Sequence, residues 1–91
     1  MKSAEGGQTR QLLKVSARAP FHVYYEGDAE IVSAVNSVGP FDILAGHADF
    51  FSVLVPCEVT IRKSVGEPVS FSIRSGIMTV RDNTILLFAN I

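Results

Sequence analysis

The sequence predicts an all-β protein, and three observations support this. Short stretches in which apolar and polar residues alternate recur along most of the chain, as expected of strands that bury one face. Turn residues separate them at intervals of roughly 8–12 residues, a spacing typical of two-layer β folds. The stretch 28–35 could form a helix, but its β-branched residues and flanking turns favour a strand. We therefore expect an antiparallel β-sandwich of two packed sheets over 11–91, preceded by a flexible leader over 1–10.

The first half of the chain is expected to contain three strands before a turn-rich central stretch. In "LLKVSARAP", Leu13, Val15 and Ala17 alternate with polar residues until Pro20 ends the strand. The next strand, "FHVYYEGDAE", is aromatic and is expected to turn at Gly27-Asp28. The third, "IVSAVNSV", has apolar residues on both faces, which is typical of an inner strand.

The second half begins with "GPFDILAGHADFF", residues 39–51, which we interpret as a bracketed loop around the short strand "FDIL". Its turns are expected at Pro40 and Gly46. "CEVTIRK" and "VSFSIRS" then alternate on either side of a hairpin connection, "SVGEP". The strands "IMTVR" and "TILLFANI" follow, with a turn at Asp82-Asn83 between them. The residues of "CEVTIRK" and "VSFSIRS" expected to face the core are Cys57, Val59, Ile61, Val69, Phe71 and Ile73.

Composition excludes several classes of protein. The net charge is -1 and Trp is absent, so the chain has neither the basic surface nor the spaced aromatic side chains of a nucleic-acid-binding protein. Hydrophobic residues make up 47% of a small domain, so some are expected to stay exposed as a partner surface. The lone Cys57 allows no internal disulfide, which fits a reducing, cytoplasmic setting. No apolar run approaches the roughly 20 residues of a membrane-spanning helix, so we expect a soluble protein.

No catalytic residues, metal ligands or cofactor site are expected. The chain lacks the spacings HxH, HExxH, GxSxG and GxGxxG, and Cys57 is expected to be a buried, inert thiol. A histidine after a glycine, as at His47, more often stabilises a turn or contacts a partner than binds a metal. One alternative remains open, a small hydrolase or metal-dependent enzyme built around His22, His47, Asp42 and Asp49.

Three segments resemble one protein family, in the same order. "FDILAGHADFFSVL" is similar to the type "GELGILPGHAPLLTAL", and "VTIRK" followed by "VSFSIRSGIMTVRDNTILLFAN" is similar to "VRIRK…FAVSGGFLEVQPNKVTVLAD". Upstream, "LLKVSARAPFHVYYEGDAEIVSAV" resembles the opening hairpin of the same family. The similarity spans Leu12 to Ile91 and is most specific at Gly46-His47-Ala48, after Ile43-Leu44. By these segments the chain resembles the N-terminal β-sandwich of the epsilon subunit of rotary ATP synthases.

The resemblance implies a non-catalytic rotor component that couples the gamma subunit to the c-ring in proton-driven ATP synthesis. It implies a cytoplasmic protein, peripheral on the inner face of the cell membrane through the complex only. Val38, Gly39, Pro40 and Phe41 would approach the c-ring, whereas His47 and Ser52 occupy gamma-facing positions. We expect Pro40, Phe41 and His47 to lie at the surface, at one end of the sandwich.

The chain also departs from the family pattern. Pro40 stands where the family often has an acidic residue, which removes an ionic contact with the ring. Epsilon subunits carry a C-terminal helical hairpin with regulatory and sometimes ATP-binding roles, whereas this chain ends at Ile91, either trimmed or naturally short, so those roles are not carried over. A stand-alone β-sandwich module that binds another protein or a carbohydrate remains the alternative function.

Overall fold

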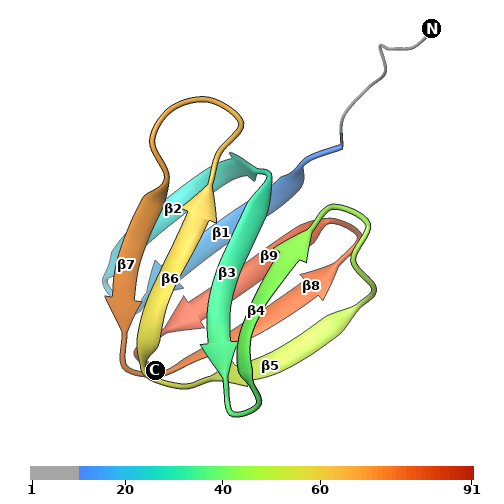
Figure 1. The fold of residues 1–91 in the computed structure, drawn as a ribbon. Coiled ribbons are helices and arrows are strands. Elements are labelled where there is room, and N and C mark those ends of the chain that lie inside the picture. The colour runs from blue at the N-terminus through green and yellow to red at the C-terminus, as the bar shows by residue number, and fades with distance from the viewer. Residues whose placement is uncertain (1–10) are drawn as a thin grey trace, which may run out of the picture.

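The structure is a computed structural model that describes residues 11–91 (Figure 1). The leader expected over 1–10 lies outside the described residues. Every regular element of the described part is a strand, which confirms the all-β prediction. In chain order the strands are β1 (Leu13–Ala19), β2 (His22–Ala29), β3 (Ile31–Asn36), β4 (Gly39–Leu44), β5 (Phe50–Leu54), β6 (Cys57–Arg62), β7 (Val69–Ile73), β8 (Gly76–Arg81) and β9 (Thr84–Ala89).

The strands form a two-layer sandwich. They hydrogen-bond along one path, β2-β1-β9-β8-β5-β3-β6-β7, with β4 added beside β3. Figure 1 shows this path folded over into a front layer of β4, β3, β6 and β7 and a rear layer of β2, β1, β9, β8 and β5. The two layers are connected where Asn36, at the end of β3, pairs with Leu54, at the end of β5. The sandwich prediction is therefore confirmed.

One strand pair differs from the predicted antiparallel arrangement. β1 and β9 run parallel, from Lys14 beside Thr84 to Arg18 beside Phe88, whereas the other pairs in residues 11–91 are antiparallel. Parallel neighbours need a long connection, and here the rest of the domain provides it. Alternation within a strand carries no information about such a distant partner, so the sequence could not reveal this pair.

The core lies between the layers and takes alternate residues from each strand. The expected inward residues of β1 are buried, and so are Val59, Ile61 and Ile73. Cys57, Val69 and Phe71 are only half-buried, although they pack against the core as predicted. The buried apolar residues are Leu13, Val15, Ala17, Ala29, Val32, Ala34, Ile43, Leu54, Val59, Ile61, Ile73, Met78, Val80, Ile85, Leu87 and Ala89.

The structure confirms the turn predicted at Asp82-Asn83 and contradicts the one predicted at Gly27-Asp28. At Asp82-Asn83 the chain reverses with φ of 49° and 61°, as predicted, because Asp and Asn tolerate the left-handed backbone of a tight hairpin. The turn predicted at Gly27-Asp28 is wrong, since β2 continues through it to Ala29. Gly27 has a φ of +152°, and a Cβ there would lie 3.1 Å from the Tyr25 hydroxyl oxygen. Backbone conformation and a close contact explain this glycine.

Pro40 lies inside β4, not at a strand boundary as predicted. β4 pairs with β3 alone among the described strands, and Pro40 is in register with Val35. The Val35 carbonyl accepts a hydrogen bond from the Val55 N–H, so Val35 directs its backbone groups away from β4. Proline is tolerated in a sheet where its missing N–H would face a free edge. At such an edge it also discourages pairing with another chain.

Aromatic side chains bridge the layers along both sides. Tyr24 of β2 stacks on Phe71 of β7 with ring centroids 4.1 Å apart. A β-bulge after Ala17 omits Tyr24 from the ladder with β1, and such bulges re-aim a side chain. On the other side, the Phe50 ring of β5 lies 5.3 Å from that of Phe41 in β4. Phe41 and Phe50 therefore close the gap between β4 and β5, which share no ladder.

Candidate partner surface

The outer face of the rear layer carries a cluster of apolar side chains. In β5, β8 and β9 the residues that alternate with core positions project away from the front layer. The register places Phe51, Thr79 and Leu86 side by side in one row. Val53, Ile77 and Phe88 form the next row. We call the apolar members of these rows the apolar face: Phe51, Val53, Ile77, Leu86 and Phe88.

Four members of the apolar face are substantially exposed. Phe51 is 65% exposed, Val53 63%, Phe88 45% and Leu86 40%. Burial of one such side chain contributes roughly 1.5–3 kcal/mol, so covering several of them strongly favours association. Contiguous exposed apolar surface of this kind marks a protein-interaction site.

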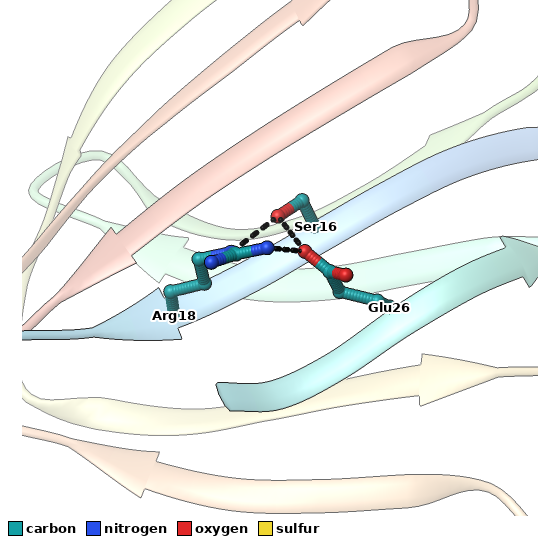
Figure 2. Close-up of polar contacts among 3 residues, drawn as sticks. All are labelled: Ser16, Arg18 and Glu26. Carbon is teal, nitrogen blue, oxygen red and sulfur yellow. Dashed lines mark hydrogen bonds and ion pairs between the residues drawn. The ribbon is translucent and has the colours of Figure 1, made fainter. Parts of the chain in front are cut away.

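A polar network borders the apolar face on β1 and β2 (Figure 2). Arg18 lies beside Phe88 in register, donates from Nε to Ser16 Oγ at 3.2 Å, and forms an ion pair with Glu26. The Ser16 hydroxyl also donates to Glu26 Oε2, at 3.0 Å. Hydrogen bonds from Arg18 and then Ser16 lower the pKa of the Glu26 carboxyl. An apolar centre with a polar rim is the usual composition of a protein interface.

The other edge of the apolar face is hollowed and charged. A shallow hollow of about 720 Å³ is lined by Phe51 and Leu86 together with Asp49, Arg81 and Asp82. Its apolar floor continues the apolar face, and its rim carries both signs of charge. A partner that covers the apolar face can therefore also form charge-assisted contacts at this edge.

The front layer presents a different outer face. Its outward side chains are mostly polar, and several bond to one another: Ser33 Oγ donates to Asp42 Oδ1 at 2.6 Å, and Thr60 Oγ1 lies 3.2 Å from Ser70 Oγ. We call these outward residues the polar face: Ser33, Asp42, Glu58, Thr60, Arg62, Ser70 and Ser72. Such a face is satisfied by water and by its own hydrogen bonds.

The predicted ring-facing residues lie at the tight turn between β3 and β4. Val38 is 94% exposed and Pro40 is exposed, whereas Gly39 and Phe41 are half-buried. The expectation that Pro40, Phe41 and His47 share one end of the sandwich is wrong. Figure 1 shows that the β3–β4 turn and the β4–β5 connection lie at opposite ends of β4. The predicted loop is in fact an edge strand with a turn at each end.

The two predicted gamma-facing residues have different environments. His47 is exposed in the connection before β5, and its Nδ1 lies 2.8 Å from the Ala48 carbonyl oxygen. The Gly46 N–H donates to Asn83 Oδ1 at 2.7 Å, which fixes this connection against the β8–β9 turn. Ser52 is only 7% exposed and points between the layers. Its hydroxyl is therefore not available for direct contact with a partner.

The residues of the enzyme alternative are held in separate local contacts. His22 packs against Tyr24, Asp42 accepts from Ser33, and His47 packs against Phe50. Within residues 11–91 no group of three or more His, Cys, Asp or Glu side chains could hold a metal ion. The Cys57 thiol is half-buried and lies 3.9 Å from the Val35 carbonyl oxygen.

Within residues 11–91 the structure contains no helix that is long and apolar enough to span a membrane.

Sequence reasoning missed most of the apolar face. The loop predicted over 39–51 includes Phe50 and Phe51, which in the structure begin β5, and the prediction of a strand at "TILLFANI" does not identify its outward apolar residues. In β9, Ile85 and Leu87 are buried while Leu86 and Phe88 are exposed. Apolar residues at both parities of a strand at the surface were the signal that could have identified this face.

Comparisons with known proteins place the chain in one family. Residues 12–91 match the family model described as the β-sandwich domain of the ATP synthase delta/epsilon chain. The ATP synthase epsilon chain of Clostridium novyi is 29% identical over 77 residues, which cover 85% of this chain and 59% of the relative. That of Ruminococcus albus is 35% identical over 75 residues, covering 82% and 55%. The chain thus spans less than two thirds of these relatives.

Two solved structures share the fold. A chain in the cryo-EM structure of the Tetrahymena thermophila mitochondrial ATP synthase central stalk and c-ring aligns with a TM-score of 0.76 at 20% identity, covering 90% of this chain and 66% of that one. A chain of the Euglena gracilis mitochondrial ATP synthase aligns with a TM-score of 0.80 at 15% identity, covering 98% and 57%. By the family match, the chain belongs to the ATP synthase delta/epsilon family through its β-sandwich domain.

Proposed function

We propose that this chain is the β-sandwich part of a non-catalytic epsilon-type subunit in the central stalk of a rotary ATP synthase. There it couples the gamma subunit to the c-ring during proton-driven ATP synthesis. The role requires rigid packing against two partners, and it includes no cofactor, metal ion or nucleic acid. The family match and the exposed apolar face support it.

The apolar face is the observation that carries the proposal. It lies on the three strands β5, β8 and β9, which are hydrogen-bonded to one another and backed by the core. Such a surface can transmit force without deforming, because protein interiors are close-packed and poorly compressible. We assign the gamma subunit to this face, with His47 as a further contact from the exposed connection that leads into β5.

The β3–β4 turn is the proposed contact with the c-ring. Val38 projects at its tip with 94% exposure, next to the exposed ring of Pro40. Because Pro40 removes the acidic group frequent in the family, we propose a contact of shape and apolar surface there. Phe41 supports the contact from within through its packing on Phe50.

These assignments also give the location. The coupled complex is anchored in the membrane by its c-ring, and we propose that this chain is cytoplasmic and peripheral on the inner face of the cell membrane. It would reach the membrane only through the complex.

The test is co-purification of the chain with gamma and c-ring subunits from the same source. We expect the chain to retain both. Phe88→Ser should release gamma, whereas the matched change Thr60→Ala on the polar face should leave both partners bound. Capture of neither subunit by the folded chain would contradict the proposal and favour the binding-module alternative.

A further inference from the structure

The side chain of Asn36, the last residue of β3, holds two parts of the sandwich at once. Its Oδ1 accepts hydrogen bonds from the backbone N–H groups of Val38 at 2.9 Å and Gly39 at 3.2 Å. Its Nδ2 donates to Ser52 Oγ at 3.0 Å. Asn36 also pairs with Leu54, where the two layers join (Figure 1). One side chain thus fixes the β3–β4 turn and fastens it to β5.

Ser52 connects this contact to the apolar face. It is the buried polar side chain of the core in residues 11–91, at 7% exposure. Because successive residues of a strand point to opposite sides, its neighbours Phe51 and Val53 project onto the apolar face. A displacement of Ser52 must therefore move both of these side chains.

The turn at the other end of the contact has little packing of its own. Val38 is almost fully exposed, and a Cβ built on Gly39 would meet no heavy atom within 4 Å. Gly39 has a φ of +144°, a conformation that other residues rarely adopt. The hydrogen bonds to Asn36 Oδ1 therefore add to the β3–β4 ladder, in which Gly39 pairs with Asn36, and help to hold the Val38 and Gly39 amides in place.

We propose that Asn36 and Ser52 are positioning residues that fix the β3–β4 turn relative to the apolar face. This inference rests on the proposed function: it identifies the internal contact through which the ring-facing turn and the gamma-facing strand keep one geometry. It also gives Ser52 a role that its burial permits, in place of direct contact with gamma.

The chemistry of the amide supports this assignment over simple capping of the turn. Capping requires only an acceptor oxygen, which an aspartate supplies equally well. The Asn36 amide in addition provides an N–H donor, and this donor reaches a residue 16 positions away on the other layer. The donor is therefore used for the contact between layers and not for the turn.

The experiment uses Ser52→Ala, which removes the acceptor and leaves the Asn36 cap of the turn in place. Ser33→Ala is the matched control, because it removes a serine hydrogen bond between β3 and β4 on the polar face. Amide hydrogen exchange is measured at Val38 and Gly39 in the free chain. Binding of the chain to purified c-ring and to gamma is then measured separately.

We expect Ser52→Ala to accelerate exchange at both amides by roughly fivefold, the factor that corresponds to one lost hydrogen bond. Affinity for the c-ring should fall by a similar factor, whereas Ser33→Ala should change neither quantity. Unchanged exchange at Val38 and Gly39 in the folded Ser52→Ala chain would overturn the inference. If that variant does not fold, Ser52→Cys, whose sulfur is a weak acceptor, is measured in the same way.

Val38→Asp separates the inference from the proposed function. If it abolishes binding to the c-ring while Ser52→Ala alters neither exchange nor binding, the inference fails and the function stands. If the wild-type chain does not bind the ring, the function fails, and the exchange measurement alone decides whether Ser52 positions the turn.

Discussion

The two outer faces of the sandwich differ although both layers contribute buried residues to one core. On the polar face, outward side chains bond to each other, as Ser33 does to Asp42 and Thr60 to Ser70. On the apolar face, Phe51 and Val53 stay more than 60% exposed with no polar neighbour in their rows except Thr79. The strands of both layers alternate regularly between inward and outward positions.

This difference separates two constraints on the same fold. An antiparallel sheet with one face in water is expected to alternate apolar inward and polar outward. Most outward positions of the front layer are polar, and Leu44 of β4, at 50% exposure, is an apolar exception. In the rear layer, β5, β8 and β9 have apolar residues at their inward positions apart from Ser52, as expected, but also at several outward positions, where polar residues are expected. Since nothing in the fold of the domain requires apolar residues there, the exposed apolar side chains support the proposed contact with a partner.

Adjacent leucines on β9 provide the most demanding test of the comparison. Leu87 is 1% exposed and Leu86 is 40% exposed. Leu87→Ser should lower the free energy of unfolding by about 3–5 kcal/mol, because it leaves a cavity and buries a hydroxyl. Leu86→Ser should change it by less than about 0.5 kcal/mol. Urea denaturation of the two variants measures both values, and equal losses would mean that the apolar face is part of the core.

The next largest effect concerns binding. Phe51→Ser should weaken binding to gamma by roughly 10- to 100-fold, the factor that corresponds to 1.5–3 kcal/mol for one aromatic side chain. The melting temperature should stay close to that of the wild type, because Phe51 is 65% exposed. Ser72→Ala on the polar face is the control. Titration calorimetry with purified gamma would refute the assignment if both variants bound alike.

Phe41 tests the boundary between packing and partner contact. If Phe41 were a surface residue, as the sequence predicts, Phe41→Ser would leave folding nearly intact. The ring is half-buried and packs on Phe50, so we now expect a loss of about 1–2 kcal/mol, between those of Leu86→Ser and Leu87→Ser. Thermal unfolding measures this loss. A negligible loss of stability would mean that the Phe41 ring contributes little to packing and is available for contact with a partner.

The smallest effect is expected at the polar rim. The pKa of Glu26 is lowered mainly by the hydrogen bond from Arg18, so any stability it contributes is present at neutral pH and is lost as the pH falls through the lowered pKa. Because the pair is exposed, Glu26→Gln should leave the melting temperature at pH 7 nearly unchanged. An NMR titration of the Glu26 carboxyl should show a higher midpoint in Arg18→Ala. An unchanged midpoint would contradict the role of Arg18.

Much of the fold could be predicted from local patterns. The alternation at Leu13, Val15 and Ala17 gave a correct strand and correct burial, and Asp82-Asn83 gave a correct turn. β5 was missed because its five residues follow a glycine turn and include two adjacent phenylalanines, so its alternation is short and masked. For the site, Pro40 and His47 were expected at one end of the sandwich because they are near in sequence, whereas most of the extended strand β4 lies between them.

The sequence by itself determined the strands, the inward residues and membership of the family, because each rests on local alternation or on an ordered set of motifs. The tertiary structure decided which strands became neighbours: the parallel pairing of β1 with β9, and the rows that assemble the apolar face from β5, β8 and β9. It also placed the Ser52 hydroxyl against Asn36 instead of a partner. Pairing between strands distant in the chain depends on the packing of the whole core, and a single strand's pattern does not encode it.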